Sequence, residues 1–263
     1  MKLYERDYTR LTINEETELG SLRQPDPIPN TRHLKVIRPI QNKVLRHHQS
    51  LFPNNYLDIV ELEDHGFLKK QIETIQELLD SSGVSEQAIL NFIKLKQAYF
   101  IVASLLKSYF RFGHHEAYLF PEFQLGNSYK PDYLLVGKNS GGWEFLFVEL
   151  ESPTELITMA NGELGSAFRK GIAQIEDWMG WLETYYGSLK ETFDKCKGAN
   201  VNLPDEFSRL DTTRLHYVVI AGRRKNFLPK TYQKRRRKQN KILILHYDNL
   251  VDPSQNLIGS RTY

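Results

Sequence analysis

Apolar and polar residues recur along the last two-thirds of the chain in patterns that predict most of its regular elements. Apolar side chains fill most positions between residues 85 and 112, which predicts one long buried helix with Ser85 as its N-cap. Residues 166–186 repeat apolar side chains at intervals of four and three, the spacing of a helix with one buried face. Short apolar runs bounded by turn residues predict strands at 118–124, 133–136, 145–150, 215–221 and 242–246.

These elements alternate in a way that indicates the fold class. With a further helix expected at 230–239, the order from residue 85 is helix, three strands, helix, strand, helix, strand. We therefore expect an α/β protein whose mixed β-sheet is flanked by helices, formed by residues 84–263.

The first 83 residues have a less regular pattern. Ser81, Ser82 and Gly83 interrupt the chain, and we place a boundary there. Residues 1–83 are expected to form an N-terminal extension or small accessory domain of mixed α+β character. Its candidate elements are strands at 8–13, 34–40 and 51–62 and an amphipathic helix at 68–79.

The net charge of +3 conceals a strong asymmetry. Residues 212–247 contain no Asp or Glu and hold 11 of the 35 Lys and Arg residues, which leaves 24 basic and 32 acidic residues in the rest of the chain. A basic segment on an acidic body is typical of a phosphate-binding surface, although a solvated helix face gives the same pattern.

Other features of the composition concern the cellular compartment. The single cysteine, Cys196, excludes an internal disulfide framework and points to a reducing compartment. The charged N-terminus lacks the apolar region of a signal peptide. The longest apolar stretch, near 100–106, is far shorter than the roughly 20 residues that a membrane span needs. We therefore expect a cytoplasmic protein without a membrane partner.

Three carboxylates lie at the ends of two predicted strands. Asp132 opens the run 133–136, and Glu149 and Glu151 close the run 145–150, where residues i and i+2 face the same way. A hairpin between these strands would place Asp132 opposite Glu149. Such a group suits Mg²⁺, which takes one or two carboxylates together with phosphate oxygens. An Asp at a strand start is also a common turn former, but a carboxylate such as Glu149 in an apolar strand is costly unless it is paired or metal-bound.

Six sequence blocks between residues 118 and 251 carry a family resemblance. In order they are FPEFQLG, KPDYLLVG, FVELESPTELI, the AQIEDW helix, YVVIAGRR and ILILHYDNLV. Together they resemble the PD-(D/E)xK nuclease superfamily, and most closely the nuclease domain of the Shedu anti-phage defence family. The resemblance implies a restriction-endonuclease-like sheet and a Mg²⁺-dependent (or Mn²⁺-dependent) endodeoxyribonuclease that acts on phage or other foreign DNA.

The resemblance also implies roles for particular residues. Asp132 and Glu149 would be the main metal ligands, with the Leu150 carbonyl and Glu122 as additional ones. Gln174, on the following helix, would orient water or a phosphate oxygen.

The chain departs from the family pattern at one catalytic position. Glu151 stands where the pattern most often has lysine. It could bind a second metal or act as a general base, or Lys170, one helical turn before Gln174, could supply the displaced cation. The alternative function is a catalytically silent nucleic-acid-binding or regulatory module that retains the nuclease fold.

The basic segment has a role in either function. Arg223 and Arg224 follow a strand and are expected near the site. The sequence does not show whether the protein binds DNA or RNA. Separately, the N-terminal extension, residues 1–83, could mediate assembly into a homo-oligomer. Contacts to the nucleic-acid backbone away from the site are expected from Lys234, Arg235, Arg236, Arg237 and Lys238.

Overall fold

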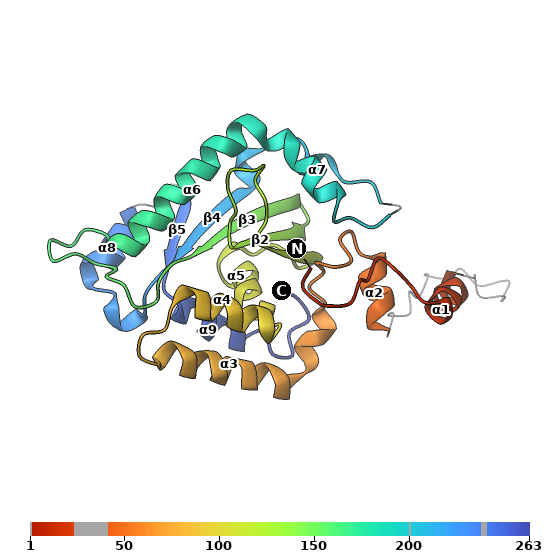
Figure 1. Ribbon diagram of the computed structural model, residues 1–263, viewed down its shortest axis with the longest axis horizontal. Helices are drawn as coiled ribbons and strands as arrows, with labels where there is room; N and C mark the ends of the chain where they lie inside the picture. Colours follow the sequence, from red (N-terminus) through yellow and green to blue (C-terminus); the bar gives the residue numbers. More distant parts are fainter. Residues whose placement is uncertain (1, 24–41, 200, 238–240) are drawn as a thin grey trace.

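A five-stranded mixed sheet forms the centre of the molecule (Figure 1). The computed structural model describes residues 2–23, 42–199, 201–237 and 241–263. The strands lie in the order β1-β2-β3-β4-β5, so neighbours in the chain are neighbours in the sheet. Their bounds are β1 Glu116–Pro121, β2 Tyr133–Asn139, β3 Gly142–Leu150, β4 Leu215–Ile220 and β5 Ile242–Leu245.

The first three strands are antiparallel, and the last three are parallel. Strands β2 and β3 form the expected hairpin, in which Asn139 pairs with Gly142 and Tyr133 with Val148. Gly142 has a φ of +111°, a conformation that glycine adopts without steric cost, and this allows the tight turn. The predicted α/β class is confirmed, and the sheet with its flanking helices is consistent with a restriction-endonuclease-like fold.

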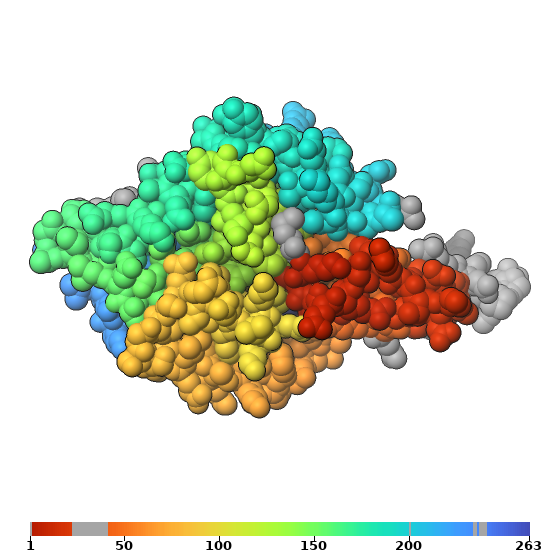
Figure 2. All heavy atoms as spheres, in the orientation of Figure 1, coloured from red at the N-terminus to blue at the C-terminus, as the bar shows by residue number. Residues whose placement is uncertain are grey.

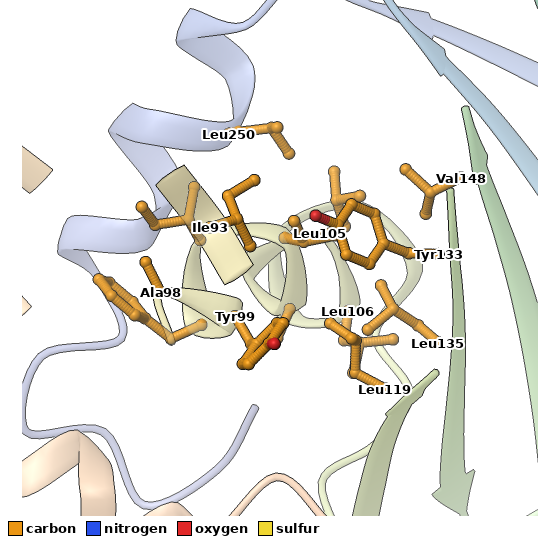
Figure 3. Close-up of a cluster of buried hydrophobic side chains, with 14 of the residues drawn as sticks. Ile93, Ala98, Tyr99, Leu105, Leu106, Leu119, Tyr133, Leu135, Val148 and Leu250 are labelled. Carbon is orange, nitrogen blue, oxygen red and sulfur yellow. The ribbon is translucent and has the colours of Figure 1, made fainter. Parts of the chain in front are cut away.

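Helices cover both faces of the sheet (Figure 1). One face packs against α6 (Ser166–Tyr185), and residues such as Phe147 point toward it. The other face packs against α5 (Tyr99–Leu105), where Val148 and Leu135 meet Leu105 (Figure 3). Successive β3 residues therefore belong to different cores, as the two-residue period of a strand requires. Outside α5 lie α3 (His65–Asp80), α4 (Glu86–Leu95) and α9 (Asp248–Gln255).

The single long helix expected at 85–112 is wrong. Helix α4 ends at Leu95, Gln97 takes a left-handed φ of +51°, and α5 starts in a direction that differs by 110°. The segment continues as a π-helical turn, Leu106–Phe110. All residues of α5 are buried, so its sequence is apolar on every side and carries no period that would have marked the break.

The same segment bears on membrane insertion. In the described part of the chain no single helix is long and apolar enough to cross a membrane. The bent pair Glu86–Leu95 and Tyr99–Phe110 meets those criteria only when its two halves are taken together.

Two of the three strands expected in the N-terminal region are wrong, and the third, 34–40, lies outside the described residues. Residues 8–12 are irregular and lead into α1 (Ile13–Arg23), where the Thr12 amide donates to Glu15 Oε2 at 2.8 Å. The Glu15 amide in turn donates to Thr12 Oγ1 at 3.5 Å, which completes a capping box, a sequence signal for the start of a helix. Residues 51–62 contribute only the bridge Tyr56–Tyr118 to the sheet, because Asp58 then caps the 3₁₀ turn Ile59–Glu63.

The remaining helices complete the structure. Helix α3 confirms the helix expected at 68–79, and α8 (Pro229–Arg237) the basic helix. The short helices α2 (Lys43–Gln49) and α7 (Leu189–Asp194) and the packed helix α9 were not expected. Side chains of α3 share one hydrophobic core with α5, α9 and the sheet, while the boundary near residue 83 stays a prediction.

Candidate functional site

Two carboxylates face each other where the β2–β3 hairpin ends. Tyr133 pairs with Val148, so Asp132 and Glu149 form the next opposed pair, on the face that α6 covers. The Asp132 carboxylate accepts a hydrogen bond from the Leu150 amide at 2.8 Å. Because this bond ties one strand end to the other, the position of the Asp132 carboxylate is set by the sheet itself.

The surroundings of this pair disfavour negative charge. Glu149 is only 5% exposed, and burial raises the pKa of its carboxyl, as do the charges of Asp132, Glu151 and Glu86. Burial also raises the pKa of Asp132, against the opposing effect of the Leu150 amide. Without a further cation, two neighbouring carboxyl groups of this kind stay protonated at pH values at which a free carboxyl group is ionised.

Helix α6 brings a positive charge to the third acid. Glu151 is 2% exposed, and its Oε2 accepts a hydrogen bond from Lys170 Nζ at 2.9 Å. Burial raises the pKa of Glu151, and Lys170 opposes that rise. The backbone of Glu151 is also fixed, because its carbonyl accepts from the buried Tyr247 hydroxyl at 2.7 Å. The cation expected from Lys170 is therefore present beside Glu151.

The close approach of α6 depends on a glycine. A Cβ at Gly171 would lie 2.7 Å from Val219 Cγ1 on β4 and 3.1 Å from Glu151 Cγ, closer than such atoms pack. Gln174 follows Lys170 by one helical turn, and its buried Oε1 has no hydrogen-bond partner within the described structure. The role of Gly171 was not predicted; its signal in the sequence is a glycine in the middle of a helical pattern.

Oxygen atoms of the site acids are the candidate ligands for a hard cation. Among the described residues no group of three or more His, Cys, Asp or Glu side chains is arranged to hold a metal ion. The acids nevertheless offer oxygen donors alone, and one oxygen each of Glu149 and Glu151 is buried without a hydrogen-bond partner in the described residues. Mg²⁺ usually takes one or two carboxylates and keeps several waters, so Asp132 and Glu149 fit its requirements.

A fourth acid, Glu86, was not anticipated. It is the first residue of α4, directly after the N-cap Ser85. Its charge raises the pKa of Asp132, Glu149 and Glu151, and its own pKa is raised by burial. An acid in the first turn of a helix is common for its favourable interaction with the helix dipole, so nothing in the sequence distinguishes Glu86.

Glu122 lies at the edge of the site and faces outward. Its amide donates to the Asp132 carbonyl at 2.8 Å, but its side chain is 60% exposed and its carboxylate pairs with Lys130 at 2.5 Å. It lines a pocket of about 530 Å³ that also includes Asp132 and Glu86. Its backbone therefore belongs to the site, whereas its carboxylate is engaged by a lysine.

The two arginines after β4 are engaged within the protein. Arg223 pairs with Asp248 at 2.9 Å and Asp80 at 2.8 Å, and only 14% of its side chain is exposed. Arg224 pairs with Asp252 and is 55% exposed.

Part of the basic helix can also be placed. Arg236 is exposed on α8. Residue Lys238 and the side chains of Lys234, Arg235 and Arg237 lie outside the described part of the structure, so their contacts with nucleic acid stay predictions.

Comparison with known proteins supplies the family. The family model described as "Shedu protein SduA, C-terminal" matches residues 83–251, well over half of the chain. The match includes all five strands, helix α6 and the acids of the site. No curated protein matches the chain. The chain therefore belongs to the Shedu family, with the SduA C-terminal domain at residues 83–251.

Proposed function

We propose that this protein is a metal-dependent endonuclease of the PD-(D/E)xK type that hydrolyses DNA in defence against phage. The observation that carries the proposal is the carboxylate pair at the end of one hairpin, the buried Glu149 opposite the partly buried Asp132, with Lys170 held beside it by Glu151. Membership of the Shedu family favours the defence role.

The metal would be Mg²⁺ or Mn²⁺, held by Asp132 and Glu149 with the Leu150 carbonyl. A bound divalent ion polarises the scissile phosphate and lowers the pKa of its bound water. The raised pKa of both carboxyls shows that their ionised forms are destabilised in the metal-free protein. A bound cation would stabilise these ionised forms.

The remaining polar residues have roles that follow from their positions. Lys170 replaces the lysine missing from the strand, and its ammonium stabilises negative charge that develops on the phosphate. Glu151 holds Lys170 in place, and its second oxygen can accept a proton from the attacking water. The unpaired amide oxygen of Gln174 accepts a hydrogen bond from that water and so orients it.

Cleavage of supercoiled plasmid with Mg²⁺ or Mn²⁺ tests the proposal. Asp132→Ala and Glu149→Ala should each abolish nicking, since either change removes a ligand of the metal. The control is Glu73→Ala, at an exposed acid on α3 that should leave nicking unchanged. Calorimetry should show weaker Mn²⁺ binding for the first two variants alone. Undiminished cleavage by both of them would remove the basis of the assignment.

The alternative, a silent nucleic-acid-binding module, is favoured by one observation. Glu151 occupies the usual lysine position, and its ion pair with Lys170 reduces the free positive charge at the site. Such a module would bind DNA in a salt-sensitive way but show little affinity for Mg²⁺. The same calorimetry therefore separates the two functions.

A further inference from the structure

A pocket opens beside Asp132 that the catalytic proposal does not use. It lies between helix α4 and the connection from β1 to β2, residues 122–132, and has a volume of about 530 Å³. Figure 2 shows these two segments, in yellow and yellow-green, side by side on one face of the molecule. Ligand sites in proteins commonly measure 300–1,000 Å³, so the pocket is large enough for a nucleotide.

The pocket is lined by both acids and lysines. Asp132 and Glu86 belong to the acidic site, and Glu122 is a third acid in the lining. Three lysines line the same pocket: Lys94 from α4, Lys130 from the connection, and Lys2. A strand whose scissile phosphate lies at Asp132 would meet these lysines with its next phosphate.

The carboxylate of Glu122 interacts electrostatically with two of these lysines. Its Oε1 accepts a hydrogen bond from Lys130 Nζ at 2.5 Å, and the pKa of Glu122 is lowered by this bond and by the charges of Lys130 and Lys94. Both partners of the pair are about half exposed, at 60% and 47%. Exposed pairs of this kind contribute little to stability, so a phosphate can displace Glu122 at little cost.

The other polar groups in the pocket are neutral. Gln87 donates to Asn91 at 3.0 Å across one turn of α4, and Gln124 lies on the opposite wall. Amides of this kind offer hydrogen-bond donors and acceptors to sugar and base edges without adding charge. The pocket thus combines cations for a phosphate with neutral groups for the attached nucleoside.

We propose that this pocket binds the DNA phosphate next to the scissile one, with Lys94 and Lys130 as its ligands. Glu122 is then the counter-ion that the phosphate displaces, rather than a ligand of the metal. The inference deepens the proposed function and rests on it for the position of the scissile phosphate at Asp132.

Binding of a short fluorescent single-stranded DNA tests the subsite. The full chain is titrated at several salt concentrations, with Ca²⁺ in place of Mg²⁺ to prevent cleavage. Lys94→Glu and Lys130→Glu should each weaken binding about tenfold, and the slope of log K against log salt should fall by roughly 0.7 for each lost contact. Lys69→Glu, the same change at an exposed lysine of α3, should alter neither.

A variant of Glu122 tests the counter-ion. Glu122→Gln should tighten DNA binding severalfold, because Lys130 loses its competing carboxylate, and should leave Mn²⁺ affinity unchanged. Weaker Mn²⁺ binding without tighter DNA binding would overturn the counter-ion role and favour metal ligation.

The outcomes separate the subsite from the nuclease. If the wild type cleaves DNA but both lysine variants bind it like Lys69→Glu, the subsite is refuted and the nuclease stands. If the lysine variants bind poorly but no metal-dependent cleavage occurs, the lysines bind a DNA phosphate, whereas the nuclease and the position of that phosphate next to a scissile one are refuted. Thermal melting of each variant confirms that the exposed substitutions leave the fold intact.

Discussion

At the scale of single residues, Glu149 links the stability of the metal-free protein to pH. Burial raises the pKa of its carboxyl, so above about pH 4 the folded protein keeps a proton that the unfolded chain releases. The folded state then binds more protons than the unfolded state. The free energy of unfolding therefore falls as the pH rises from about 4 through neutral, by about 1.4 kcal/mol for each unit of difference in pKa.

Glu149→Gln should reduce this dependence in the presence of EDTA, and the part due to the raised pKa of Asp132 should remain. We expect the variant to match the wild type near pH 4, where both side chains are neutral, and to exceed it in stability at pH 8. Urea denaturation across this range gives the comparison, with Glu73→Gln as the exposed control. Mg²⁺ should stabilise the wild type more at pH 8 than at pH 6, because binding requires the deprotonated carboxylate. Parallel pH curves for wild type and variant would contradict this account.

At the scale of elements, local patterns predicted the hairpin and helix α6 but not the break between α4 and α5. The β2–β3 pair and the opposition of Asp132 and Glu149 follow from strand period and turn residues, which are properties of adjacent sequence. Lys170 was found because residues four apart share a helix face. Glu86 was missed because its approach depends on how α4 packs beside the sheet and on the bend before α5, which no local pattern records.

The packing of α6 on the site yields a prediction with an internal control. Gly171→Ala would place a methyl group 2.7 Å from Val219 and force the helix away from Glu151. Overpacking of this kind costs about 1–3 kcal/mol, which outweighs the gain in helix propensity of up to about 1 kcal/mol. Gly180 lies on the same helix, and no atom lies within 4 Å of a Cβ added there. Gly180→Ala should therefore show only the stabilisation that comes from higher helix propensity.

Urea denaturation and metal binding measure the two glycine variants. We expect Gly171→Ala to destabilise the protein and to weaken Mn²⁺ binding, because the new methyl group presses on Glu151 and Val219 and so disturbs the strand ends that carry the metal ligands. Gly180→Ala should stabilise the protein and leave Mn²⁺ affinity unchanged. Equal stability changes in both variants would mean that α6 can shift without cost to the site.

At the scale of the whole molecule, Arg223 joins regions that lie far apart in the chain. Its guanidinium donates to Asp80 and to the Leu79 carbonyl at the end of α3, and to Asp248 at the start of α9. Directly before it, the Gly222 amide donates to the Ser152 carbonyl at 3.1 Å, next to Glu151. The Arg223 side chain therefore connects the N-terminal region with the C-terminal helix, and the backbone of Gly222 connects this junction with the strand end that carries the site.

Replacing Arg223 should therefore destabilise the protein more than replacing the adjacent Arg224. Arg223→Ala leaves several half-buried acceptors without their donor, and hydrogen bonds to charged groups contribute about 1.5–3 kcal/mol, so we expect a loss of this order. Arg224→Ala breaks one exposed pair, with an expected loss below about 1 kcal/mol. Denaturation curves of the two variants test the difference. If Arg223→Ala proves as mild as Arg224→Ala, the N-terminal region and the site are held together by the shared hydrophobic core rather than by this arginine.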